Sequence, residues 1–568
     1  MIKCFACVAL LGVAAPLGAQ TGVDTTGTAA IVRQATDHSE VMKNLQYLAD
    51  VIGPRLTGSA AMRRANDWTA ERFKAYGLTA ALEPWDFGVT WERGVVTARL
   101  LAPFQRGVTA HSWAWTAGND GKPMAGPVVL VNVSSPESLA VYKDRMNGAW
   151  LITGQPATIF NPDGPPMTAS DSAALRARRN QPRVPRDTSP AAVARRRQFQ
   201  TDLPYLLRQA GALGRLTDGG KEQGLMTMSG SPYSVSPLPN LVIAHEDYAQ
   251  LARLIQNGVT PRFEAAITNT MGIKPVQQYN TVAEIRGTEK PGEVVILGAH
   301  LDSWDLGTGT TDNGTGSMVV LEAARAIAES GLKPKRTIRF ILFSGEEEGL
   351  LGSAAYAAQH AATADSVQAV LVLDNGTGMI TGQALQGRNQ DEQLWKDLLA
   401  PVASLGAKNV RQGNKGGTDH LSFIPYGVPG WNFDQETRGY NHTHHSQVDT
   451  YDHAVGSDLI QASAVMAATA FELANHPTLL PRGYGSAHGA SSAGGGVSSK
   501  RGREAQRTKG SRAEPRQSAE AVAALNSRPR IPKPTTVTRV GFEPTTYGLK
   551  VKIFTSSAFD CVSLGMSL

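Results

Sequence analysis

The run Glu293-Val-Val-Ile-Leu-Gly-Ala-His300-Leu-Asp302 is the most informative part of this chain. After Glu293 it is apolar as far as Ala299 and rich in β-branched side chains, which predicts a buried central strand over 293–299. His300 and Asp302 then stand at the carboxyl end of that strand, where open α/β sheets place their sites. The run therefore predicts both a sheet and a functional site at one edge of it.

A Gly/Thr-rich loop follows this strand and carries Asp312, and a helix is predicted over 317–329. A His and two Asp between a strand and a helix indicate a metal site. The alternative is a surface turn that happens to be rich in Asp. Four further candidate ligands at strand and helix ends favour the metal site.

Strand and helix patterns alternate from Tyr279 to Asn475, which predicts an α/β fold with a mixed central sheet and helices on both faces. The predicted strands cover 281–286, 293–299, 336–344, 368–374 and 428–434. The predicted helices cover 317–329, a segment from Glu346, 391–405 and 459–475. Upstream, helices are predicted at 37–50 and 60–76, and strands at 79–87 and 95–101, after a polar lead-in at 20–35.

The stretch from 111 to 270 differs, because short β-type runs replace the alternation and no cluster of metal-binding residues occurs there. It is interpreted as an inserted β-rich domain. The expected organisation is a signal peptide at 1–19, the first part of the main domain at 20–110, the insertion at 111–270, the ligand-bearing part at 271–482 and a basic tail at 483–568.

The net charge of +6 does not indicate a nucleic-acid or membrane-surface partner. Residues from Ser486 onward carry thirteen Lys/Arg and five Asp/Glu, which leaves a charge of −2 for the rest of the chain. The Arg/Pro-rich segment 176–197 is interpreted as a solvated loop and not as a basic binding patch. The basic character therefore belongs to the tail, which is Gly/Ser-rich and predicted to be disordered. Its last stretch, 539–554, has no periodic partner upstream, so an artefactual C-terminus is suspected.

The N-terminus has Lys3, an apolar run from Cys4 to Ala15 and small residues before Gln20. This pattern predicts a secretory signal peptide cleaved after Ala19, and hence a secreted or periplasmic protein. The run is shorter than the ~20 residues of a membrane span. Cys4 and Cys7 leave with the signal and Cys561 lies in the tail, so any metal must be held by His and carboxylates.

The run Ser344-Gly-Glu346-Glu347-Glu348-Gly-Leu-Leu-Gly-Ser353 follows another predicted strand. Two adjacent carboxylates cannot point the same way, so one can bind metal while the other works as a general base. A row of Glu before a helix can also simply complement the helix dipole. Asp374 ends the next strand, where it is either a ligand or a turn cap.

Three His occur within the four positions 442–445, although the chain has only 12. The collected set of candidate ligands is His300, Asp312, Glu347, Asp374 and His445, with Asp302 and Glu346 beside them. Two His and three carboxylates suit two Zn²⁺ ions about 3.5–4 Å apart that share one carboxylate. Asp302 can accept the other N–H of the His300 ring and fix its tautomer.

The order H-x-D, D-N-G, E-E-x-G-L-L-G-S, strand-end D and H-S-x-x-D-T resembles the M28 family of co-catalytic zinc peptidases over about 37–475. The resemblance implies that His300 and Asp374 bind different zinc ions, that Asp312 bridges them and that Glu347 and His445 complete the two sites. It also implies Glu346 as the general base and a protease-associated (PA) domain at 111–270. The run His444-His445-Ser446 is similar to a secreted dipeptidase branch, whereas other members often have Tyr before the last ligand. The oxyanion-stabilising group therefore stays open, with His444 as a candidate.

The resemblance implies a short peptide substrate, most simply a dipeptide with free termini. A broader aminopeptidase is the alternative. An M20-type hydrolase is disfavoured because the insertion precedes His300, and a catalytically dead receptor-like protein because all seven positions are kept. Candidate anchors for the substrate termini are Asp305, Glu348, Asp434 and Glu436 for an amine, and Lys415 and Arg438 for a carboxylate. A homodimer is compatible with the sequence, which fixes neither the assembly nor the metal loaded.

Overall fold

The computed structural model describes residues 25–157, 159, 187–483, 539–545 and 548–554. The chain divides into two units, 1–495 and 496–568. The expected signal peptide and most of the basic tail lie outside the described residues. In the second unit, β17 (Arg539–Thr545) and β18 (Gly548–Phe554) pair as an antiparallel hairpin. The two halves of this stretch thus pair with each other, and the absence of a periodic partner upstream stays a prediction.

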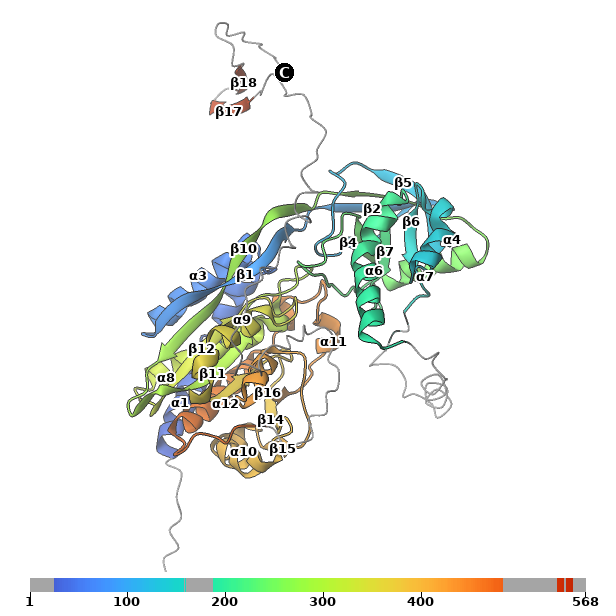
Figure 1. Cartoon of the computed structure of the whole chain (residues 1–568). Helices are drawn as coiled ribbons and strands as arrows, with labels where there is room; N and C mark the ends of the chain where they lie inside the picture. The colour runs from blue at the N-terminus through green and yellow to red at the C-terminus, as the bar shows by residue number, and fades with distance from the viewer. Residues whose placement is uncertain (1–24, 158, 160–186, 484–538, 546–547, 555–568) are drawn as a thin grey trace, which may run out of the picture. The chain divides into compact units, whose positions relative to one another are not determined.

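An eight-stranded mixed sheet, called the central sheet below, forms the body of the first unit (Figure 1). Strand β11 lies in its middle and runs parallel to β12 and β13, and β16 continues this parallel block. The order is β1 (Thr79–Glu92), β10 (Thr270–Ile285), β12 (Arg336–Phe343), β11 (Lys290–His300), β13 (Val367–Val372), β16 (Gly430–Gln435), β14 (Ile380–Ala384) and β15 (Asn409–Arg411). The predicted fold class, a mixed sheet with helices on both faces, is confirmed.

The two faces of β11 bury alternate residues, as the period of a strand requires. Val295 and Leu297 pack in a core with α1 (Thr25–Asp37), α3 (Ala60–Ala75), α8 (Thr315–Glu329) and α12 (Gly456–Asn475). Ile296 faces the other way, towards α9 (Leu351–Gln359). Further helical segments on the chain are α2 (Val41–Gln46) and α10 (Glu392–Leu399). Burial on both faces explains why the strand is apolar from Val294 to Ala299.

The part of the chain that runs from the end of β1 to the start of β10 forms a second eight-stranded sheet, called the inserted sheet below. Its strands β5 (Met124–Val131), β6 (Trp150–Thr153), β7 (Gly214–Asp218) and β8 (Asn240–Ile243) are parallel. The antiparallel strands are β2 (Val96–Ala102), β3 (Arg106–Gly107), β4 (Ala110–Ser112) and β9 (Arg262–Ile267). Helices α4 (Pro136–Met146), α6 (Pro190–Gln209) and α7 (His245–Gln256) accompany them. The insertion therefore contains three helices beside its strands, which the prediction of an inserted β-rich domain did not include.

The chain leaves the central sheet at the end of β1 and returns to it at the start of β10, and these two ends are adjacent. Strands β1 and β10 run side by side as a long antiparallel pair, in which Glu92 faces Thr270 (Figure 1). Since β2 already belongs to the inserted sheet, that sheet begins earlier than the expected boundary at 111. The expected end near 270 coincides with the start of β10.

Three local predictions differ from the structure. The expected polar lead-in contains most of α1, whose Ile31 and Ala35 are fully buried in the core. The helix expected from Glu346 begins only at Leu351, because the residues before it form a turn with Leu350 at a φ of 62°. Residues 190–197 of the expected Arg/Pro-rich loop lie in α6, which Ser189 caps, while 176–186 lie outside the described residues. Among the described helices, none is long and apolar enough to cross a membrane.

Candidate metal centre

Three neighbouring parallel strands place the candidate ligands at one edge of the central sheet. His300 is the last residue of β11 and pairs in register with Phe343, the last residue of β12. Glu346 and Glu347 follow in the turn after β12, and Asp374 lies two residues beyond the end of β13. The carboxyl ends of parallel strands meet at the same edge, so residues far apart in sequence converge there.

Asp312 lies between the two candidate histidines and turns one oxygen towards each. The His300 Nε2 atom is 3.4 Å from Asp312 Oδ1 and 3.5 Å from Asp374 Oδ1. The His445 Nε2 atom is 3.3 Å from Asp312 Oδ2 and 3.0 Å from Glu347 Oε2. The structure thus brings all five predicted ligands into two groups that share Asp312.

The nitrogen and oxygen atoms of this cluster are better arranged to bind metal ions than to satisfy one another by hydrogen bonds. His300 Nε2 and Asp312 Oδ2 are buried and have no hydrogen-bond partner among the described residues. Leaving buried polar atoms unpaired costs about 1–3 kcal/mol each, and a coordinated cation would remove that cost. Burial raises the pKa of Glu346 and of Glu347 well above the usual range, and nearby carboxylates add to the rise. The His and carboxylate donors, with no thiolate, are a set that zinc accepts.

Asp302 contacts His300 differently from the prediction. The Nδ1 atom of His300 lies 3.1 Å from the Asp302 backbone carbonyl, whereas the Asp302 carboxylate is 3.6 Å away. That carboxylate accepts hydrogen bonds from the Thr57 hydroxyl (3.1 Å) and the Glu347 backbone N–H (3.2 Å). Asp302 therefore helps to orient both His300 and Glu347.

Arg55 is a positioning residue that the sequence analysis missed. It is fully buried, and its guanidinium donates to the carbonyls of Leu301 (2.6 Å), Thr308 (2.8 Å) and Gly309 (2.6 Å). Burial lowers its pKa to about 10, although Asp449 and other nearby carboxylates raise it. Arg55 thus holds the loop between His300 and Asp312. In the sequence, Arg55 is a single arginine after Gly53-Pro54 in a predicted turn, and nothing in that pattern indicates this role.

Asp449 positions Asp312 through the backbone. Its carboxylate accepts the N–H groups of Thr311 (2.6 Å) and Asp312 (3.1 Å). Asp449 is the Asp of the H-S-x-x-D-T run in the sequence analysis, where it was part of the motif but was given no role. Tyr440, at the start of α11 (Tyr440–Thr443), also lies at the site, with its ring 5.1 Å from that of His444.

His444 and His445 stack on each other with ring centroids 3.7 Å apart. The Nε2 atom of His444 is 3.7 Å from Asp312 Oδ2, and its side chain is 44% exposed. His444, His445 and Asp312 also form a group close enough to share one ion. His444 therefore lies at the open side of the centre, either as a donor to substrate or as an extra ligand.

The inserted sheet supports the loop that carries these histidines. The ammonium of Lys221 donates to the carbonyls of Asn441 (2.9 Å), His442 (3.3 Å) and His444 (2.6 Å). The backbone N–H of Met228 donates to the His445 carbonyl (2.9 Å). Lys221 and Met228 both follow β7, so a segment of the insertion fixes the backbone of a candidate ligand. Burial lowers the pKa of Lys221 to about 8.

Most of the expected anchors for substrate termini are engaged elsewhere. Lys415 donates to the Phe433 carbonyl (2.7 Å) and Arg438 to Asp458 (2.8 Å). Three of the carboxylates form ion pairs: Asp305 with Arg93 (2.9 Å), Asp434 with Arg411 (2.7 Å) and Glu436 with Arg438 (2.9 Å). Glu348 differs, since both its oxygens are buried without a hydrogen-bond partner among the described residues.

Comparison with known proteins assigns the domain to a class. Residues 280–470 match the model of Peptidase family M28, a range that includes all five candidate ligands. The predicted resemblance is confirmed for that domain, and the match supports a metallo-exopeptidase.

Within that class the chain is similar to carboxypeptidase Q. It is 28% identical to carboxypeptidase Q of Bos taurus over 452 residues, which cover 78% of this chain and 86% of the relative. It is 27% identical to carboxypeptidase Q of Homo sapiens with the same coverage.

Solved structures share the fold. A Peptidase M28 precursor from Shewanella amazonensis superposes with a TM-score of 0.64 at 23% identity, covering 81% of this chain and 98% of that one. BSAP, a zinc aminopeptidase from Bacillus subtilis, gives a TM-score of 0.53 at 17% identity over 76% of this chain and 94% of that one.

Proposed function

We propose that this protein is an exported exopeptidase that uses two zinc ions to hydrolyse dipeptides with free termini. The observation that carries the proposal is the placement of Asp312, whose two oxygens face His300 and His445 at 3.4 and 3.3 Å. A carboxylate between two such groups is the arrangement of a two-metal site. The similarity to carboxypeptidase Q, over most of both chains, supports the peptidase chemistry.

The proposal gives each predicted residue a role. Asp374 and His300 would hold one ion on one side of Asp312, and Glu347 and His445 the other. The ions would supply Lewis acidity, which lowers the pKa of a bound water and polarises the scissile carbonyl. The insertion would serve as the PA-like domain of the protein, and the N-terminal apolar run as its export signal.

Glu346 is proposed as the general base. Its Oε2 atom lies 4.0 Å from His300 Nε2, so it stands beside the ligands without being part of either close pair. A buried carboxylate with an elevated proton affinity can take a proton from water and deliver it to the leaving amine. His444, exposed at the rim, is proposed to donate a hydrogen bond to the oxyanion.

A broader aminopeptidase is the second candidate. The chain is 29% identical over 223 residues to leucine aminopeptidase 1 of Uncinocarpus reesii, which covers 35% of this chain. Moreover, Lys415 and Arg438, the cations expected to bind a substrate carboxylate, already donate to protein acceptors.

Three matched substrates separate the candidates: Ala-Leu, its C-terminal amide and its N-acetyl derivative. A dipeptidase is expected to cleave the first and to lose at least about tenfold in kcat/KM on each of the others, because each lacks one charged terminus. Equal kcat/KM for the dipeptide and its amide would reject recognition of the carboxylate and identify an aminopeptidase. Zinc content, measured by elemental analysis on the same preparation, is expected to be two ions per chain.

A further inference from the structure

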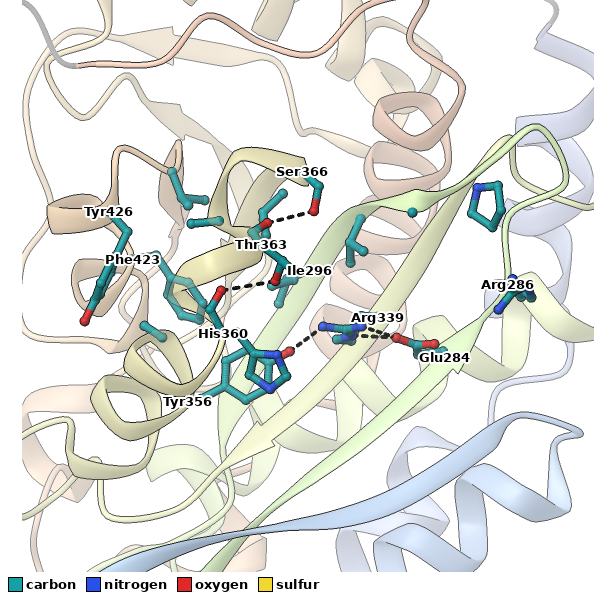
Figure 2. A pocket seen from close by; sticks show the side chains of 17 residues that line it. Glu284, Arg286, Ile296, Arg339, Tyr356, His360, Thr363, Ser366, Phe423 and Tyr426 are labelled. Atoms are coloured by element: carbon teal, nitrogen blue, oxygen red, sulfur yellow. Dashed lines mark hydrogen bonds and ion pairs between the residues drawn. The ribbon is translucent and has the colours of Figure 1, made fainter.

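A cavity lies on the α9 face of the central sheet, and Figure 2 shows the side chains that line it. Its volume is about 320 Å³, within the range of small-molecule sites. Strand β11 contributes Val294 and Ile296 to the lining, whereas the candidate ligand His300 ends the same strand. Ile296 and His300 are four positions apart along the strand, a distance of about 13 Å. The cavity is therefore distinct from the candidate metal centre.

The floor of the cavity is apolar. Val294, Ile296, Val367, Phe423 and Val428 line it, and each is at most 8% exposed. These side chains belong to one packed cluster with α9, so the floor is a fixed surface of the core. Such a floor favours an aliphatic or aromatic ligand body.

One wall is polar but already satisfied. The Arg339 guanidinium donates to Glu284 (2.6 Å) and to the Tyr356 hydroxyl (2.6 Å). The His360 ring stacks on Tyr356 with centroids 4.2 Å apart (Figure 2). The same ring bonds Glu83 at 2.8 Å. These contacts use the principal donors and acceptors of the wall, so they shape the cavity and leave little for a ligand.

Arg286 is the charged group left over. It lines the cavity and is exposed, and within the described parts of the chain its side chain makes no hydrogen bond or ion pair. Within the lining, the charges of Glu284 and Arg339 cancel each other, and the His360 ring is bonded to Glu83, which lies outside the lining. The lining therefore carries one uncompensated positive charge, presented as a planar group that pairs well with a carboxylate.

We propose that this cavity binds a small monocarboxylic acid with an apolar body. The body lies over the floor of Ile296, Phe423 and Val428, and the carboxylate pairs with Arg286 at the mouth. A polyanion such as a nucleotide would need more cations than this lining offers. A cationic ligand would need a carboxylate that is not already paired.

The test uses 4-phenylbutyrate as the probe and its neutral amide as the matched compound, with binding measured by calorimetry on the full-length, metal-loaded protein. The acid is expected to bind with a dissociation constant at or below about 1 mM, the range for a ligand of this size. The amide should bind about five- to tenfold more weakly, because it lacks the ion pair. Equal binding of acid and amide, or no binding of either, would overturn the proposal.

Two variants locate the binding, since a carboxylate could also bind at the metal centre. Arg286→Gln should weaken acid binding about five- to tenfold and leave amide binding unchanged. Ala364→Phe, which fills the cavity from its wall, should abolish binding of both. Arg262→Gln removes an exposed arginine of the inserted sheet and is the matched control. Melting curves check that each variant is folded. Unchanged affinity in both cavity variants would place the acid at the metal centre and reject the cavity as its site.

Discussion

The central sheet and the inserted sheet each hold eight strands, with a parallel block beside antiparallel strands. Both carry a His and an Asp at the carboxyl ends of their parallel strands. In the central sheet, His300 Nε2 and Asp312 Oδ2 are buried without a hydrogen-bond partner among the described residues, and Asp312 Oδ2 lies 3.3 Å from His445 Nε2. In the inserted sheet, Asp218 ends β7 and bonds His245 at 3.1 Å, and its oxygens also accept the N–H groups of Gly220 (2.9 Å) and Ala157 (2.8 Å).

The difference shows that position at a strand end is not enough to define a site. Asp218 and His245 satisfy each other and fix a turn, and the segment that follows carries Lys221 to the His444 carbonyl. The central sheet leaves candidate metal donors without a hydrogen-bond partner among the described residues, whereas the inserted sheet uses its polar groups to hold a loop. The candidate ligands thus come from the elements of the central sheet, and support for the last of them comes from the insertion.

The sharpest test of the central sheet is His445→Ala. Removing one nitrogen donor from the group of Asp312 and Glu347 should abolish activity and reduce bound zinc, as measured by elemental analysis. His444→Ala, one residue away, is the matched control and should keep both ions while lowering kcat. Loss of zinc in the control as well would make His444 a ligand.

The next largest effect is expected for Glu346→Gln. A general base contributes about 10²- to 10⁴-fold to the rate, so kcat should fall by that factor while zinc content stays unchanged. The amide has the size of the carboxylate, so this change tests charge and not packing. Metal loss in this variant would exchange the roles of Glu346 and Glu347.

The parts of the molecule that could be predicted from the sequence are those that depend on residues close together in the chain. Apolar runs such as 293–299 indicated the strands of the central sheet, and residues at their carboxyl ends indicated the ligands, because parallel strands align those ends. The helices of the insertion and the Lys221 contacts were not predicted, since they depend on pairings between segments far apart in sequence. Lys221 looks like any surface lysine until the fold places it 2.6 Å from the His444 carbonyl.

The role of the inserted sheet is tested by Lys221→Met, which keeps the length of the side chain but removes three hydrogen bonds to the 441–444 backbone. Residues that orient a metal ligand typically contribute 10- to 100-fold to metal affinity or activity. We expect a loss of about tenfold in kcat and weaker zinc binding, with a melting temperature close to that of the wild type. Zinc affinity is measured by competition with a chelator.

Lys122→Met is the control for this change, because Lys122 is an exposed lysine of the same insertion. It should alter neither kcat nor zinc affinity. If Lys221→Met behaves like this control, the inserted sheet does not support the centre, and the contrast between the two sheets fails.

The smallest effect is expected beyond both sheets, in the basic tail. A chain ending at Gly483 keeps every described contact of the first unit, so its melting temperature and kcat/KM should match those of the full chain. A chain ending at Leu480 differs by three residues but loses the Pro481 and Gly483 carbonyls, which accept hydrogen bonds from buried Arg388 at 2.7 and 2.6 Å. Removing them should cost about 1–3 kcal/mol of stability without changing the metal centre. Thermal melting and the dipeptide assay compare the two truncations, and a fall in activity on cutting at Gly483 would show that the tail contributes to the site after all.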